Sequence, residues 1–95
     1  MVEITFDPFK RNLTLSERGL DFADAHRVFA GPKYTGLDAR FDYGEPRYIT
    51  VGHLAERMVV IVWTPRGETR RIISMRKANE REQARYAGHI GDTGT

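Results

Sequence analysis

The run of residues 58–75 constrains the fold more than any other part of this 95-residue chain. Residues Met58–Trp63 are apolar on both alternating faces, which is typical of a central strand covered from both sides. Thr64–Gly67 has the proline and glycine placement of a type I turn, and Glu68–Met75 then alternates. The run therefore predicts a β-hairpin at the centre of a sheet.

The N-terminal third predicts a short strand followed by two helices. Asp7 and the proline after it form a helix start, and Phe9 and Leu13 lie one turn apart on what should be the inner face. In the second helix, four residues share one face, and His26 among them is more often structural than catalytic. The predicted elements are a strand at Glu3–Phe6, a helix from Pro8 to about Arg18, and a helix from Asp21 to Gly31–Pro32, with Phe22, Ala25, His26 and Phe29 on its shared face.

The middle of the chain is the least regular part. Ala39–Tyr43 alternates, and it is either a strand or a partly ordered excursion. Arg47–Leu54 predicts a strand that breaks at Gly52–His53, and Asn79 with Glu82 predicts the capped start of a last helix, which ends near Gly88. The order β-α-α-β-β-β-α predicts an α+β domain, with helices covering one face of a mostly antiparallel sheet. We expect one domain over residues 1–90 and a flexible tail over residues 91–95.

Several classes of protein are disfavoured by what the sequence lacks. It has no cysteine, so disulfides and thiolate metal sites are excluded. No apolar run approaches the roughly 20 residues that a membrane span needs, and the N-terminus opens into an alternating strand instead of a leader. Three scattered histidines without ligand-like spacing predict no metal site. We expect a cytoplasmic protein that needs neither a cofactor nor a membrane.

Cationic residues gather in the C-terminal half, although the formal net charge is only +2. Between Arg66 and Arg85 there are seven Lys or Arg residues and three Asp or Glu residues. This density is typical of a small RNA- or DNA-binding surface, and a merely solvated face has the same composition.

The strand that begins at Thr69 carries the clearest candidate groups. Regular alternation would place Arg70 and Arg76 on the same face, and two guanidinium groups projecting together form a phosphate-binding pattern. Arginines on strands also commonly point to water or make surface ion pairs. Arg76 stands out because it lies where the strand gives way to a helix, a common place for functional groups.

Other candidates are single residues. His53 follows a glycine near a strand end, and its ordinary pKa suits proton transfer at neutral pH. Tyr86 shares a helical face with Glu82, whose plainest role is helix capping. Lys10 lies near the positive end of its helix, a poor place for a cation unless it holds a phosphate there. His89 is interpreted as a solvated residue of the tail.

Five pieces of the sequence follow one another over residues 4–88: Phe6–Lys10, Gly19–Ala25, Tyr48–Gly52, Arg70–Arg76 and the helix with Glu82 and Tyr86. Together they resemble the BrnT family of bacterial toxins. The resemblance implies a RelE-like ribonuclease fold and a toxin–antitoxin pair, in which a BrnA-type antitoxin with a ribbon-helix-helix DNA-binding part covers the toxin. It also implies that the complex binds its own operator DNA and represses the operon. The chain departs from the family, which commonly has His and Asn where Arg18 and Thr14 stand here.

This resemblance predicts an endoribonuclease that cuts RNA without metal and thereby inhibits translation and growth. Cationic side chains would stabilise the phosphate, and a histidine or tyrosine would transfer protons. The alternative is a non-catalytic RNA- or protein-binding module, which would keep the same basic surface. The candidate catalytic residues are Arg76, Arg70, His53, Tyr86 and Lys10, and the candidate substrate-binding residues are Lys77, Arg71 and Arg66.

Overall fold

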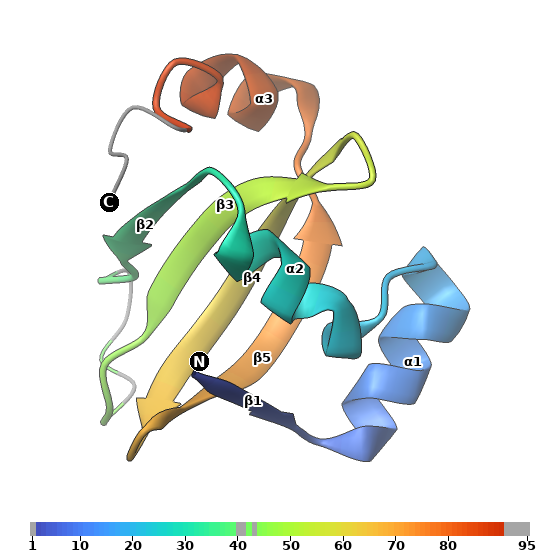
Figure 1. Ribbon diagram of the computed structural model, residues 1–95, viewed down its shortest axis with the longest axis vertical. Helices are drawn as coiled ribbons and strands as arrows, with labels where there is room; N and C mark the ends of the chain where they lie inside the picture. Colours follow the sequence, from blue (N-terminus) through green and yellow to red (C-terminus); the bar gives the residue numbers. More distant parts are fainter. Residues whose placement is uncertain (1, 40–41, 43, 91–95) are drawn as a thin grey trace.

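The computed structural model describes residues 2–39, 42 and 44–90, and it is an α+β structure, as predicted (Figure 1). Five strands form one sheet in the order β1-β5-β4-β3-β2. β1 runs parallel to β5 and every other neighbouring pair is antiparallel. Within the described ranges, no helix is long and apolar enough to cross a membrane. The elements are β1 (Glu3–Phe6), α1 (Pro8–Arg18), the 3₁₀ helix η1 (Phe22–Asp24), α2 (Ala25–Ala30), β2 (Lys33–Leu37), β3 (Tyr48–Leu54), β4 (Arg57–Arg66), β5 (Thr69–Lys77) and α3 (Glu80–Tyr86).

The irregular middle of the chain contains a strand that the sequence did not indicate. β2 pairs antiparallel with β3 and forms one edge of the sheet. The alternating stretch Ala39–Tyr43 falls mostly on residues 40, 41 and 43, which lie outside the described residues, as does the tail at 91–95.

The central hairpin is confirmed, but its turn lies two residues later than predicted. Pro65 is inside β4, where it pairs with Arg70, and the chain turns at Gly67 and Glu68. Gly67 has a φ of +58°, which suits glycine as the first residue of a tight hairpin loop. Pairing of β3 with β4 ends at Trp63, so the missing N–H of Pro65 removes no bond from the sheet on that side.

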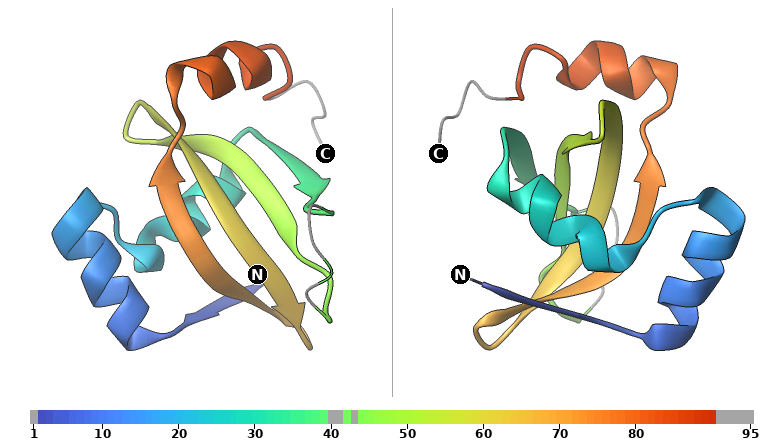
Figure 2. Two further views of the ribbon diagram at one scale, coloured as in Figure 1. Left: turned by 180° about the vertical axis from the view of Figure 1, so that it is seen from behind. Right: turned by 45° about the vertical axis from the view of Figure 1, so that its right-hand side comes forward.

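The helices cover both faces of the sheet, so the prediction that they share one face is wrong. Alternate residues of β4 point in opposite directions, and they belong to two different apolar clusters. One face carries α2, and the other carries α3 near the end of the sheet (Figure 2). The α2-face cluster includes Phe22, Ala25, Val28, Phe29, Val59, Ile61, Ile72 and Met75. The α3-face cluster includes Val51, Val60 and Ala78, with Tyr86 and Ile90 packed against it.

Gly52 explains how closely α2 lies on the sheet. A Cβ atom at this position would stand 2.7 Å from Cγ1 of Val28, closer than real contacts allow. β3 runs through Gly52 and His53 without the predicted break, because the glycine is required by the approach of a helix and not by a turn.

α1 begins at Asp7 and ends at Gly19, as predicted, but it does not bury an apolar face. None of its eleven described residues is buried, and Phe9 and Leu13 point to solvent instead of inward. The helix lies beside the sheet in both figures. Hydrogen bonds from Arg11 to Asp21 and from Arg18 to the backbone oxygen of Met75 attach it to the rest of the domain.

Candidate nucleic-acid interface

An extra residue in β5 reverses the side-chain alternation that the sequence predicted. Val62 of β4 pairs with Ser74, and the next residue of β4, Trp63, pairs with Ile72. Ile73 is therefore a β-bulge, with no partner of its own opposite it. Because side chains alternate with a period of two, residues on either side of the bulge change face relative to a regular strand.

Arg70 and Arg76 consequently lie on opposite faces, and the prediction that they project together is wrong. Arg76 pairs with Val60 on the α3 face. The guanidinium carbon of Arg70 lies 4.2 Å from the ring centre of Phe29 and 5.3 Å from that of Trp63, on the α2 face. These two arginines are too differently placed to hold one phosphate.

Arg70 lines a small cavity of about 170 Å³ between β1 and α2. Burial lowers the pKa of this guanidinium, which stays charged. His26, on the exposed side of α2, also lines the cavity, and its Nδ1 is 2.7 Å from the carbonyl oxygen of Ala23. His26 therefore makes a hydrogen bond within its own helical segment, as a structural histidine would. The residue is exposed, however, and does not face the core.

Three of the predicted cationic residues meet in a second cavity of about 190 Å³, here named the basic cavity. Lys10 comes from α1, Arg66 from the end of β4, and Arg71 from β5. Four cationic side chains face this cavity, against two carboxylates. Its lining residues are Asp7, Lys10, Glu45, Arg47, Arg66, Arg71, Ile72 and Ile73.

Both carboxylates of the basic cavity are already engaged. Asp7 Oδ1 accepts a hydrogen bond from the backbone N–H of Phe9 at 2.9 Å, as the cap of α1. Glu45 Oε1 lies 3.3 Å from Nη2 of Arg66. Within residues 2–39, 42 and 44–90, neither Lys10 nor Arg71 has a side-chain hydrogen bond or ion pair. Lys10 and Arg71 are therefore the cations of this cavity that are available to an anion.

Arg76 is in a different electrostatic state at the other end of β5. Its Nη1 and Nη2 donate to the two oxygens of Glu82, at 2.7 and 2.9 Å. Glu82 also accepts from the backbone N–H of Asn79, which completes the predicted capping box of α3. The hydrogen bonds from Arg76 lower the pKa of Glu82 to about 2, so this carboxylate is ionised at neutral pH.

The candidate proton donors lie on the α3 face. Tyr86 is half-buried, and its ring centre is 5.5 Å from that of Tyr34 in β2. His53 is exposed on β3, where it pairs with Met58. Lys77 lines a wider pocket of about 450 Å³ between the β3–β4 turn and the start of α3.

Three residues near the candidate groups were not found from the sequence. His89, interpreted as a solvated residue of the tail, is exposed, and its ring centre also lies 5.7 Å from that of Tyr34. Tyr34 belongs to the unpredicted strand β2, and Arg47 lies in the loop just before β3. No local pattern marks any of them, because each reaches its place through strand pairing or the path of the chain.

A comparison with known protein families identifies the family of this chain. The family model described as the ribonuclease toxin BrnT of type II toxin–antitoxin systems matches residues 6–82, which include β5 and all the predicted cationic residues. A comparison with curated proteins gives no match. The chain therefore belongs to the BrnT family of ribonuclease toxins of type II toxin–antitoxin systems.

Proposed function

We propose that this chain is an endoribonuclease that cuts RNA without a metal ion, and that the basic cavity binds a phosphate at the scissile bond. The observation that carries the proposal is the convergence of Lys10, Arg66 and Arg71 from three separate elements. A surface that is only solvated has no reason to bring cations together, because their mutual repulsion is unfavourable. A phosphate group removes that repulsion.

RNA supplies its own nucleophile. The 2′-hydroxyl oxygen forms a bond to phosphorus as a base takes its proton, and the bond from phosphorus to the 5′-oxygen breaks as an acid protonates that oxygen. The products end in a 2′,3′-cyclic phosphate and a 5′-hydroxyl. Lys10 and Arg71 stabilise the negative charge that develops on the phosphate, an effect typically worth about 10²–10³ in rate.

Proton transfer at the scissile bond is not assigned to His53 or Tyr86, although both lie on the same face of the sheet as Arg71. His53 pairs with Met58, whereas Arg71 pairs with Thr64, roughly 20 Å farther along β4, so both candidates lie near α3 and out of reach of a phosphate in the basic cavity. A positioned acid or base typically adds about 10²–10⁴ in rate. Glu82 is a poor choice for this step, since a carboxylate with a pKa of about 2 is a weak base and is not protonated at neutral pH. The role of Glu82 is to hold Arg76 and to cap α3.

The RNA strand is proposed to run along β5 from the basic cavity to α3. Arg71 pairs with Thr64 and Arg76 pairs with Val60, and these two β4 residues point to the same face. Arg76 and Lys77 would then contact neighbouring phosphates, and Tyr86 would stack on a base. Arg70 is left out of this site because the bulge turns it to the α2 face.

The partner is proposed to be a BrnA-type antitoxin with a ribbon-helix-helix part. The free toxin acts in the cytoplasm, where RNA cleavage inhibits translation and growth, and the complex with the antitoxin binds operator DNA and represses the operon. Membership of a type II toxin–antitoxin family supports the existence of an antitoxin. A mobility-shift assay of the operator with toxin, antitoxin and both together tests the repression.

The first test is incubation of the purified protein with bulk RNA, with and without EDTA, beside the Lys10→Ala and Arg71→Ala variants. We expect cleavage that resists EDTA, yields 2′,3′-cyclic phosphate ends and falls in both variants. Arg27→Ala is the matched control, because Arg27 is an exposed arginine of α2. RNA that shifts on a gel without being shortened, both alone and in a translation extract, would contradict the proposal and favour a binding module.

A further inference from the structure

α1 is an amphipathic helix whose apolar side faces solvent and whose charged side faces the domain, the reverse of an ordinary surface helix. At 100° per residue, Arg11 and Arg18 lie on one side, and Phe9 and Leu13 lie on the opposite side. Phe9 is 73% exposed and Leu13 is 45% exposed. An ordinary helix of a small domain turns its apolar stripe toward the core and its charges toward water.

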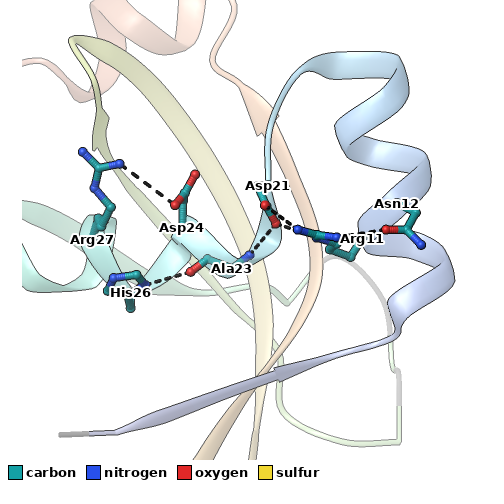
Figure 3. A network of polar contacts seen from close by, with 7 residues as sticks. All are labelled: Arg11, Asn12, Asp21, Ala23, Asp24, His26 and Arg27. Carbon is teal, nitrogen blue, oxygen red and sulfur yellow. Dashed lines mark hydrogen bonds and ion pairs between the residues drawn. The ribbon is translucent and has the colours of Figure 1, made fainter.

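The polar side of α1 is what attaches it to the domain (Figure 3). Arg11 donates from Nε and Nη2 to the two carboxylate oxygens of Asp21, at 2.8 and 2.7 Å. Arg18 Nη1 donates to the backbone oxygen of Met75 at 3.0 Å. These bonds fix the rotation of the helix about its axis, so Phe9 and Leu13 cannot reach the core without breaking them.

The outward apolar side of α1 adjoins the basic cavity. Lys10 follows Phe9 in the sequence and lies on the flank of the helix, where it lines that cavity. A partner that covers Phe9 and Leu13 therefore comes within reach of Lys10. Two neighbouring exposed apolar side chains beside uncompensated positive charge describe a surface for an acidic amphipathic partner.

We infer that the outward face of α1 is the docking surface of the antitoxin, and that the docked segment is an amphipathic helix with carboxylates along one flank. Its apolar side packs on Phe9 and Leu13, and a carboxylate enters the basic cavity beside Lys10. The antitoxin then occupies the place of the RNA phosphate, so inhibition is competitive. This last step rests on the proposed function, whereas the docking itself does not.

A second copy of the chain fits this face less well. α1 carries Lys10, Arg11 and Arg18 against a single carboxylate, Glu17. A symmetric pair of these helices would bring like charges together and would place the two basic cavities side by side, which is unfavourable. An acidic partner would cause neither of these repulsions between like charges.

The test compares a double variant, Phe9→Gln with Leu13→Gln, with the full-length wild type. Both residues are exposed and neither lies in the proposed cleavage site, so folding and RNA cleavage by the toxin alone should be unchanged. The dissociation constant for the purified cognate antitoxin, measured by titration, should rise by about 100-fold or more. The antitoxin should also fail to protect RNA from the double variant.

Leu37→Gln is the matched control, since Leu37 is 63% exposed at the opposite edge of the sheet and should leave antitoxin affinity unchanged. The inference is overturned if the double variant binds antitoxin as wild type does, or if Leu37→Gln weakens binding equally. It is also overturned if light scattering shows that the double substitution only dissolves a toxin homodimer. Binding is read without RNA, so a wild type that never cleaves RNA would refute the proposed function and leave the docking result standing.

Discussion

The two halves of β5 carry similar residues in opposite electrostatic states. Before the bulge, Arg71 faces the basic cavity and has no anionic partner among the described residues. After the bulge, Arg76 is held by both oxygens of Glu82. Arg71 in the first half is thus available to an anion, whereas Arg76 in the second half already has an anionic partner.

This difference teaches that arginine content alone does not define a phosphate site. What distinguishes the halves is whether a carboxylate from another element reaches the guanidinium. A phosphate can bind at the basic cavity at once, whereas at Arg76 it must compete with an ionised carboxylate whose pKa is about 2. We therefore place the main phosphate contact before the bulge and an auxiliary one after it.

Met75→Ala should have the largest effect on stability, because Met75 follows the bulge and is fully buried in the α2-face core. We expect the free energy of unfolding to fall by about 2–5 kcal/mol, which urea unfolding measures. Deletion of Ile73 tests the bulge itself. It leaves Ile72 opposite Trp63 and Ser74 opposite Val62, so the other residues of β5 keep their faces and the cost should be smaller than that of Met75→Ala. A deletion as costly as Met75→Ala would refute the assignment of the bulge.

Alanine substitutions of the three arginines of β5 should separate the halves kinetically. Arg71→Ala should lower the single-turnover rate at saturating RNA by about 10²–10³, and Arg76→Ala should lower it by less. Arg70→Ala should leave the rate nearly unchanged, because its side chain lies on the α2 face. Rapid-quench measurement with folded variants, checked by circular dichroism, provides the comparison. If Arg70→Ala lowered the rate as much as Arg71→Ala does, the assignment of the two arginines to different roles would be wrong.

Glu82→Gln should sharpen the contrast through its pH dependence. The pKa of Glu82 in the folded protein, about 2, lies below its ordinary value of 4.5, so its stabilisation is present above pH 5 and is lost as the pH falls toward 2. Because Arg76 is 41% exposed, we expect a contribution of about 1–2 kcal/mol, less than the full pKa change implies. Thermal unfolding from pH 7 to pH 2 should show a smaller acid loss in the variant.

The same variant bears on RNA binding. Without the competing charge of Glu82, Arg76 should pair with a phosphate more readily, and RNA affinity should rise several-fold at low salt. Unchanged affinity at every salt concentration would mean that the second half of β5 does not contact RNA.

Lys77→Ala should give the smallest effect. Lys77 is exposed at the last paired position of β5, opposite Val59, so it should contribute one phosphate contact and no chemistry. The slope of log binding constant against log salt concentration should decrease in magnitude by about 0.7, as expected for one contact to single-stranded RNA. The cleavage rate at saturating RNA should not change. A filter-binding series in increasing salt measures the slope.

Local chemistry was enough to predict some elements from the sequence. Asp7 and Asn79 cap α1 and α3 as expected, because capping depends on residues only a few positions apart. The apolar run of β4 also predicted a central strand. These features depend on near neighbours, so the sequence alone contains the necessary information.

Features that depend on distant partners were missed. The bulge at Ile73 arises from register with β4, and regular alternation therefore misplaced Arg70. Periodicity correctly grouped Phe9 with Leu13, but it cannot say whether the core or a partner covers them. β2 contains a glycine and little apolar alternation, and its place is fixed by pairing with β3, including the hydroxyl contact of Thr35 with Thr50 at 2.9 Å.

The parallel pairing of β1 with β5 has a consequence for the cell that makes this protein. Glu3 pairs with Thr69, 66 residues later, and the basic cavity joins Lys10 to Arg66 and Arg71 of the β4–β5 hairpin. At about 5–20 residues per second, ribosomes need roughly 3 to 13 s to span that interval. The nascent chain therefore cannot assemble the basic cavity until most of it has been translated.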